Sequence, residues 1–287
     1  MTSSGWAAQR RRTDLMQGLV VAVALIAFLL PLGWTALASF GIVPRGTYPA
    51  SLVWAPTLDH YADLGIAEPQ FWQELATSTI VAIAATTVTV SVGLLAAYAL
   101  ARSRFPAQRT MVQSFLVLAS LPVMAYALPL GEEMRRLGLA DTYQGLILSV
   151  SAVTAPLAVY VLYGQLSQLS TEWEEAAWLD GAGLGRVLRS VVIPLTRPAI
   201  AATAIVVFVL DWNLLLVPLV VTSVNVKTIP VAMVDFFTFE RELEWPTAAA
   251  GLIVSLVPLT ILVAVGHRLL DRFTLRTDPT QGAGTTA

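Results

Sequence analysis

The side chains that most often carry chemistry are scarce in this chain. It has no cysteine, and its only histidines are His60 and His267. A zinc site gathers about four such ligands in one cluster, so we expect no metal site built on them. Lys227 is the single lysine and lacks the Gly-x-x-x-x-Gly-Lys context of a P-loop, so we expect no ATPase site. No residues are predicted to be catalytic, and the chain is predicted not to be an enzyme.

The segment from Ser170 to Pro198 has the most distinctive spacing of polar and small residues. Glutamates crowd its start, where the positive end of a helix favours acids, so we predict a helix from about Glu172 to Asp180. Thr171 and Glu174 have the spacing of a capping box, in which each side chain satisfies a backbone N–H group near the helix start. The segment is long for a connection between helices, which favours a functional role.

Glycines at positions 181, 183 and 185 then interrupt the helix. A second helix is predicted from about Leu184 to Ile193, ending before Pro194. The two helices and the glycines between them form a hairpin within residues 170–198. Its small side chains would let a partner surface approach its backbone closely. The alternative is an amphipathic hairpin that lies on a membrane surface, which its Trp and Arg residues also suit. The residues alone leave both interpretations open.

The composition indicates the environment of these segments. Hydrophobic residues make up 56% of the 287 residues, charged residues 13%, and the mean hydropathy is +0.70. Soluble domains carry about 25% charged residues, so this chain could not cover a water-facing surface of its size. The absence of cysteine excludes a secreted disulfide scaffold, and the net charge of −2 argues against a nucleic-acid partner. A polytopic membrane protein in contact with lipid remains.

Six apolar stretches are long enough to cross a bilayer core of about 30 Å, which takes about 20 residues per helix. They are continuous rather than alternating, which predicts helices and not barrel strands. The predicted fold class is an all-α integral membrane protein with six transmembrane helices in residues 15–269. Residues 1–14 and 270–287 are terminal segments, and the polar end is predicted to be disordered. The predicted spans are Leu15–Phe40, Leu75–Ala101, Met111–Leu130, Gln144–Leu166, Ala199–Thr222 and Ala248–Leu269.

Arginines set the predicted orientation. With the N-terminus in the cytoplasm, every inner segment carries three arginines, and no outer loop carries more than two basic residues. Basic residues concentrate on the cytoplasmic side, so both termini and the segment 170–198 are predicted to be cytoplasmic. The outer segment 225–245 collects aromatic residues that suit contact with a protein or a sugar, or else an aromatic belt at the membrane interface. These contact candidates are Phe236, Phe237, Phe239 and Trp245.

Asp211 is the one clear acid inside an apolar stretch, and Trp212 and Asn213 follow it. An ionisable residue at membrane depth is by default a candidate for a transport pathway. The structural alternative is a carboxylate that lies near a helix end or bonds a neighbouring helix. Both interpretations stay open, with these three residues as the candidates for a substrate pathway.

The hairpin resembles the EAA motif of ABC importer permeases. Glu175-Ala176-Ala177, Asp180-Gly181-Ala182 and Ile193-Pro194 match the family pattern, and the 19-residue step from Glu175 to Pro194 agrees with it. The resemblance covers nearly the whole chain and is typical of the carbohydrate-uptake branch, in the position of the smaller maltose-type permease subunit. Its other matching segments are Leu137–Gly145 and Trp212-Asn213 with Pro218, and its departures are Leu188, Ile193 and Leu214, where the family often has Phe, Leu and an acid.

The resemblance implies a type I ABC importer permease (MetI-like) fold in a bacterial cell membrane, with cytoplasmic coupling helices. It implies a heterodimer with a homologous second permease, a dimer of ATPase subunits that bind ATP and Mg, and an extracytoplasmic solute-binding protein. The loop 170–198 would then couple closure of the ATPase dimer to alternating access for a sugar or sugar-like solute. The coupling residues that it implies are Glu172, Glu175, Ala176, Ala177, Asp180, Gly181, Ala182, Leu184 and Pro194.

Two alternatives come from other classes of protein. An ion-coupled secondary carrier would work alone and would follow an ion gradient without ATP. A non-transporting membrane scaffold would show no solute flux in any reconstituted complex. The scarcity of buried charge beyond Asp211 speaks against the carrier, because such carriers need ionisable relays at membrane depth.

Overall fold

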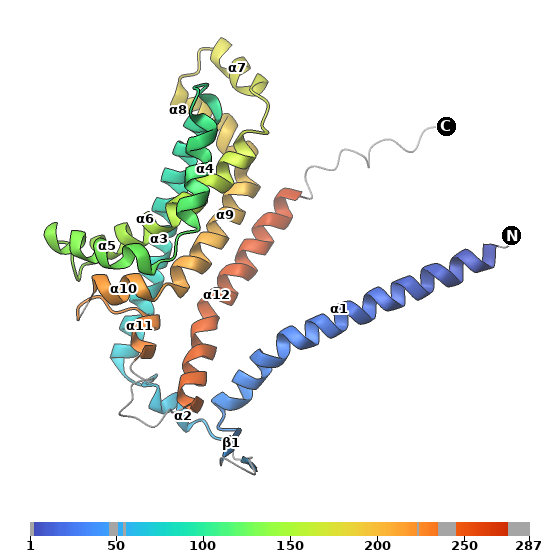
Figure 1. Cartoon of the computed structure of the whole chain (residues 1–287), viewed down its shortest axis with the longest axis vertical. Coiled ribbons are helices and arrows are strands. Elements are labelled where there is room, and N and C mark those ends of the chain that lie inside the picture. The colour runs from blue at the N-terminus through green and yellow to red at the C-terminus, as the bar shows by residue number, and fades with distance from the viewer. Residues whose placement is uncertain (1–2, 46–50, 54–55, 223, 235–244, 275–287) are drawn as a thin grey trace. The chain divides into compact units, whose positions relative to one another are not determined.

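The computed structural model describes residues 3–45, 51–53, 56–222, 224–234 and 245–274 (Figure 1). Within these residues the elements are helices apart from two three-residue strands. The chain divides into two compact units, which are described separately. One comprises Met1–Phe71 with Asp235–Leu256, and the other comprises Trp72–Val234 with Val257–Ala287.

The first unit begins with the long helix α1 (Ser3–Ser39), whose apolar part starts at Met16. An 18-residue apolar window of this helix has no buried residue, whereas Ala38 and Ser39 at the end of the helix are buried. Strands β1 (Val43–Arg45) and β2 (Ser51–Val53) pair antiparallel, and the short helix α2 (Asp59–Asp63) follows. The hydroxyls of Ser39 and Tyr61 lie 2.8 Å apart and join the end of α1 to α2.

Four more long helices are apolar enough to cross a membrane, which together with α1 makes five in the described chain. A sixth span is reached if one bent helix pair counts as a span, so the described chain has five or six apolar spans and the predicted all-α membrane fold is confirmed. The four helices are α3 (Pro69–Arg102), α6 (Tyr143–Leu166), α9 (Ile193–Asn213) with the turns before it, and α12 (Trp245–Thr274).

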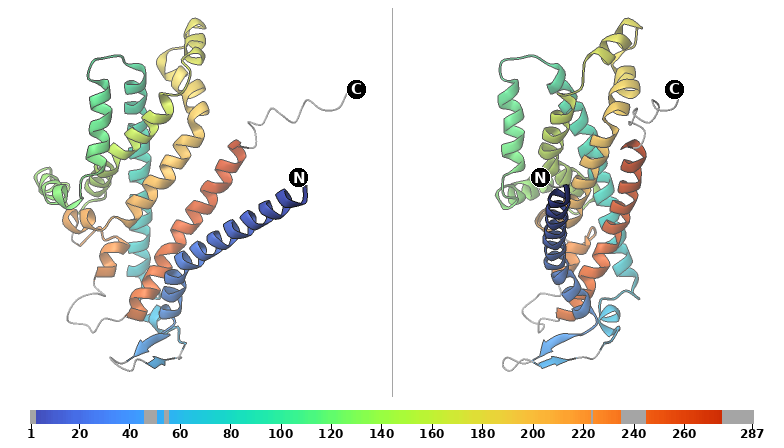
Figure 2. Two further views of the ribbon diagram at one scale, coloured as in Figure 1. Left: turned by 45° about the vertical axis from the view of Figure 1, so that its right-hand side comes forward. Right: turned by 90° about the vertical axis from the view of Figure 1, so that its right-hand side faces the viewer.

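The predicted span Met111–Leu130 is wrong as a single helix. The chain forms α4 (Gln108–Ala119) and α5 (Met124–Arg136), which meet at a bend of 92°. Pro122 lies in the break, and a proline both lacks a backbone N–H and disfavours helical geometry in the residue before it. Both views in Figure 2 show α5 beside α10 (Leu216–Val221). The two helices approach closely at Gly131, where a β-carbon would clash with Val220.

The second hairpin helix does not end before Pro194 as predicted. Helix α8 (Leu184–Val187) leads into a π-helical turn, η1 (Leu188–Val192), and the chain continues without a break into α9. Pro194 occupies the first turn of α9, where a missing N–H is tolerated, and the wider π turn precedes it. The predicted fifth span is therefore shifted: the helix starts well before Ala199 and ends at Asn213.

After Asn213 the backbone of Leu214 is extended, and the chain resumes as α10 and then α11 (Ile229–Val234). The predicted continuation of the span to Thr222 is wrong for this reason. Of the polar end at 270–287, residues up to Thr274 belong to α12, and the remainder lies outside the described residues. The predicted tail therefore begins within a helix.

Two apolar clusters hold the second unit together. One lies where α3, α6 and η1 meet and includes Leu94, Leu162, Leu166 and Val192. The other gathers side chains of α3, α5, α6 and α10 around Leu146 and Val150, both of which are fully or almost fully buried. Helices α3 and α6 approach closely at Gly93, where a β-carbon would stand 3.0 Å from the side chain of Ala158. These contacts make α3 and α6 the frame that positions the hairpin.

Candidate functional site

The hairpin forms at one end of the second unit, beyond the ends of α3 and α6 (Figure 1). Helix α7 (Glu172–Leu179) matches the first predicted helix within one residue. Gly181 follows with a φ of +79°, a left-handed conformation that glycine adopts without steric cost. The N–H of Gly181 donates to Trp178 O, and the N–H of Ala182 donates to Ala177 O, both at 2.9 Å. This pair of bonds is a Schellman motif, so local backbone chemistry ends α7 here.

The predicted capping box is wrong. Thr171 precedes α7 but makes no side-chain cap bond to its backbone. Its hydroxyl instead donates to Glu175 Oε1 at 2.9 Å on the exposed side of the helix. Glu174 turns the other way and has no exposed surface. The carboxylate is unavailable for capping because it has stronger partners on another helix.

Those partners are Tyr98 and Arg102, one helical turn apart near the end of α3. Arg102 donates from Nε and Nη2 to Glu174 Oε1 at 2.9 and 2.6 Å, and the Tyr98 hydroxyl donates to Oε2 at 2.9 Å. Arg102 also donates to the carbonyls of Leu166 and Leu169, at 3.1 and 3.3 Å, where α6 ends. We call Tyr98, Arg102 and Glu174 the ionic cluster. Sequence reasoning missed it, although the Tyr98–Arg102 spacing places both residues on one helix face.

The predicted coupling residues divide between two sides of the hairpin. Ala177 and Ala182 pack against the apolar cluster of α3 and α6, so they support the hairpin from inside. The residues on the other side are exposed, and Leu179 is exposed over 90% of its surface. Pro194 lies in α9, apart from the exposed side. The exposed residues are Glu172, Trp173, Glu175, Ala176, Trp178, Leu179, Asp180, Gly181 and Leu184. An exposed apolar patch edged by acids is typical of a surface that another protein covers.

The pathway candidates do not share one environment. Asp211 is buried in the last turn of α9, where Thr86 of α3 donates a hydrogen bond to its Oδ2 at 3.1 Å. Trp212 is also buried and stacks on Phe208, with ring centroids 5.9 Å apart. Asn213 is exposed, and its amide donates to Val209 O at 2.7 Å. The bond from Thr86 favours the structural interpretation of Asp211, and the pathway role stays a prediction.

Asp141 is a further residue that sequence reasoning missed. Its backbone is left-handed, with a φ of 56°, in the turn between α5 and α6. Its carboxylate accepts hydrogen bonds from the backbone N–H groups of Val224, Asn225 and Val226, at 3.0–3.2 Å. The side-chain amide of Asn225 donates to it as well, at 2.9 Å. Asp141 thus fixes the loop between α10 and α11, although the two segments are more than 80 residues apart.

The contact candidates of the outer segment lie mostly beyond this description. Phe236, Phe237 and Phe239 fall outside the described residues. Trp245 begins α12 and is largely exposed. The loop that leads toward this segment is held by α3, because Ser78 Oγ accepts from the N–H of Ile229 at 2.7 Å. Contact of these aromatic residues with a binding protein remains a prediction.

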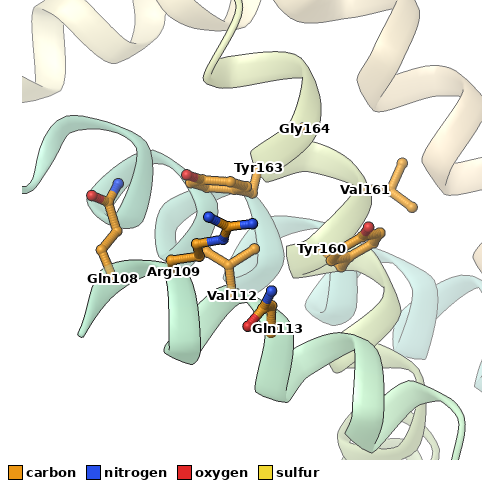
Figure 3. Close-up of a pocket in the computed structure, with 8 residues that line it drawn as sticks. All are labelled: Gln108, Arg109, Val112, Gln113, Tyr160, Val161, Tyr163 and Gly164. Carbon is orange, nitrogen blue, oxygen red and sulfur yellow. The ribbon is translucent and has the colours of Figure 1, made fainter. Parts of the chain in front are cut away.

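A pocket of about 550 Å³ lies between α4 and α6 (Figure 3). Figure 3 shows the guanidinium of Arg109 on α4 beside the ring of Tyr163 on α6, with Gln113 farther along α4 and Tyr160 farther along α6. None of the predicted pathway or coupling residues lines this pocket. The pocket and the pathway candidates are therefore separate features of the second unit.

The fold and these features define a class: a polytopic helical membrane protein with a short helical hairpin that presents an exposed face. The chain belongs to the family of binding-protein-dependent transport system inner membrane components, whose model matches residues 89–276. These proteins are the permease subunits of ABC importers. The expected type I importer permease fold is confirmed by this match together with the helical architecture.

Two curated relatives are similar over most of their length. The trehalose transport system permease protein of Mycobacterium tuberculosis (strain CDC 1551 / Oshkosh) is 33% identical over 88% of this chain and 92% of its own. The trehalose/maltose transport system permease protein of Thermococcus litoralis (strain ATCC 51850 / DSM 5473 / JCM 8560 / NS-C) is 30% identical with the same coverage of both chains. The resemblance to the carbohydrate-uptake branch is therefore confirmed.

Solved structures share the fold at lower sequence identity. A chain of a bacterial ABC transporter that imports the acidic polysaccharide alginate aligns with a TM-score of 0.69 and 20% identity, covering 91% of this chain and 97% of that one. A chain of the MetNI methionine ABC transporter, in an inward-facing conformation, aligns with a TM-score of 0.54 and 16% identity. That alignment covers 70% of this chain and 93% of the other.

Proposed function

We propose that this permease subunit imports a neutral disaccharide or a related short oligosaccharide, driven by ATP that partner subunits hydrolyse. The curated relatives are named for trehalose and for trehalose or maltose, and they align with nearly nine tenths of this chain. That breadth supports a solute of the same chemical class. A second, homologous permease would complete the pathway, and a solute-binding protein would deliver the sugar on the outer side.

The exposed face of the hairpin is the observation that carries the coupling part of this proposal. Leu179, Trp173 and Trp178 lie open on α7, edged by Glu172 and Glu175. Exposure of such an apolar face to water is unfavourable. A partner that covers it stabilises the complex by about 25 cal/mol per Å² of apolar surface buried. We propose that a cytoplasmic ATPase subunit, which binds ATP and Mg, covers it. Closure of the ATPase dimer would then move the hairpin, and the helical bundles would rock to alternate access.

The orientation follows from the same proposal. The hairpin can meet a cytoplasmic ATPase only if residues 170–198 and both termini are on the inner side. The three arginines in each predicted inner segment support this orientation through the positive-inside rule. The loop between α10 and α11 would then face the binding protein, with Asp141 holding its base.

The proposal is tested by co-expressing this chain with its second permease and its ATPase. Leu179→Glu places a charge on the proposed interface, and it should not affect folding because Leu179 is almost fully exposed. We expect the amount of co-purified ATPase to fall at least tenfold, with a similar loss for Glu175→Lys. Leu137→Glu is the matched control, because Leu137 is an exposed leucine at the end of α5, away from the hairpin.

Uptake of radiolabelled trehalose and maltose into proteoliposomes tests the solute class. Uptake of either sugar should require ATP and the solute-loaded binding protein. The docking role is wrong if both hairpin variants retain full ATPase and uptake. The solute class is wrong if the wild-type complex hydrolyses ATP in response to its binding protein but takes up neither sugar.

A further inference from the structure

The inward side of the hairpin is held by charge as well as by apolar packing. Glu174 has no exposed surface, and the side chain of Arg102 is only 14% exposed. All three hydrogen bonds to the Glu174 carboxylate come from α3, and the bonds from Arg102 to Leu166 and Leu169 add the end of α6. Helix α7 is thus joined at one point to both helices that frame the second unit.

A buried ion pair of this geometry resists separation. Removing a carboxylate from water is costly, and the cost is offset only while its partners stay in place. The guanidinium of Arg102 is planar and has donors on several sides, so it can bond Glu174 and two backbone carbonyls at once. If α7 moved away from α3, the carboxylate, the guanidinium and the Tyr98 hydroxyl would all lose partners together. Movement of α3, α6 and α7 together as one body keeps all of these bonds and therefore costs the least free energy.

We propose that the ionic cluster transmits the displacement of the hairpin to α3 and α6, with Arg102 as the positioning residue. This inference rests on the proposed docking of the hairpin to an ATPase. It assigns different roles to adjacent glutamates: Glu175 faces the ATPase, and Glu174 ties α7 to the membrane helices. From the ionic cluster, α3 runs to Thr86, which bonds Asp211 of α9, and to Ser78, which bonds Ile229 at the start of α11. A displacement at one end thereby reaches the α10–α11 loop at the other.

The test separates docking from transmission by hydrogen–deuterium exchange in the complete complex in nanodiscs. Exchange is measured without nucleotide and with Mg-ATP plus vanadate, which traps closed ATPase dimers. Peptides from residues 170–187 report on the hairpin. Peptides from residues 216–229 report on α10 and the loop after it, which is bonded to the far end of α3 through Ser78. In the wild-type complex we expect nucleotide to change exchange in both sets of peptides.

Two variants address the ionic cluster, and one serves as a control. Arg102→Met leaves the buried Glu174 carboxylate without its cation, so it should weaken assembly as well as transmission. The double variant Arg102→Met/Glu174→Gln removes both charges and should restore assembly to at least half of the wild-type yield. In the double variant we expect the hairpin peptides still to respond to nucleotide, while the response of peptides 216–229 falls at least fivefold. Arg104→Met changes an exposed arginine two residues away and should leave both responses unchanged.

Arg102→Lys gives the graded case. Lysine keeps the positive charge but cannot bond Glu174 and both carbonyls with one planar group, so we expect an intermediate response at the far end. The inference is overturned if the double variant assembles and its far peptides respond as in the wild type, since the cluster would then serve stability alone. A wild-type complex whose hairpin peptides ignore nucleotide would instead refute the docking proposal on which the inference rests.

Discussion

Thr86 and Asp211 join two membrane helices that are far apart in the sequence. The Thr86 hydroxyl donates to Asp211 Oδ2 at 3.1 Å, while Oδ1 of the same carboxylate is buried without a hydrogen-bond partner among the described residues. A carboxylate in this setting holds α3 against α9 but leaves part of its bonding capacity unused. This contact supports a structural role for Asp211, and a role in the solute pathway stays a prediction.

We expect Asp211→Asn to preserve the link between α3 and α9, because the amide oxygen can still accept from Thr86. Its melting temperature in detergent should stay within a few degrees of the wild type, and sugar uptake within about twofold. Thr86→Val should be the more harmful change, since it removes a hydrogen bond from the buried carboxylate and costs about 1–3 kcal/mol of unfolding free energy. A stable Asp211→Asn protein with uptake reduced at least tenfold would assign this residue to the pathway.

Three substitutions of Asp141 should rank in a definite order. Asparagine tolerates the left-handed backbone and keeps one of the two acceptor oxygens, so Asp141→Asn should be the mildest change even though its amide NH2 then faces backbone N–H donors. Glycine relieves the backbone but loses the carboxylate, so it should be intermediate. Alanine loses the acceptor and keeps the unfavourable φ of 56°, and it should cost about 2–3 kcal/mol. Hydrogen–deuterium exchange at residues 224–229 measures the effect, and exchange in all three variants equal to that of the wild type would show that Asp141 does not fix this loop.

Gly181→Ala tests the backbone conformation that ends α7. No atom lies within 4 Å of the β-carbon position, so the expected cost of about 1–2 kcal/mol arises from the φ of +79° alone. Gly183→Ala is the matched control, because that β-carbon is equally unobstructed and the backbone φ is −76°. Amide exchange in residues 172–187 of the complex should rise about fivefold or more for Gly181→Ala only. The same rise in both variants would attribute the effect to side-chain bulk.

The absence of cysteine makes the predicted orientation directly testable. Single cysteines at Leu179 and Leu137 lie on exposed surfaces of the hairpin and of the turn after α5. In oriented membrane vesicles, a membrane-impermeant maleimide should label Leu179→Cys from the cytoplasmic face and Leu137→Cys from the opposite face. Labelling of both positions from the same side would contradict the orientation that the arginines predict.

Composition and short-range patterns were enough for the outline of this protein. Continuous apolar stretches predict membrane helices because each helix satisfies its own backbone hydrogen bonds, whatever its neighbours are. The end of α7 was also predictable, since a left-handed glycine and its two hydrogen bonds involve residues that are adjacent in the chain. The third span and the second hairpin helix were misjudged because a proline permits either a break or a continuation. The chain breaks at Pro122, whereas at Pro194 it continues from the π turn into α9.

Only the tertiary structure decided which acid of the hairpin faces inward. The sequence by itself determined that glutamates start α7, and their helical spacing does not tell an inner face from an outer one. Glu174 meets Arg102 across 72 residues, and Asp141 meets Asn225 across 84, so neither pair leaves a local signal. Charges at such separations come together only when the packing of apolar helices brings their ends to the same place. That packing is a property of the whole second unit and of no single segment.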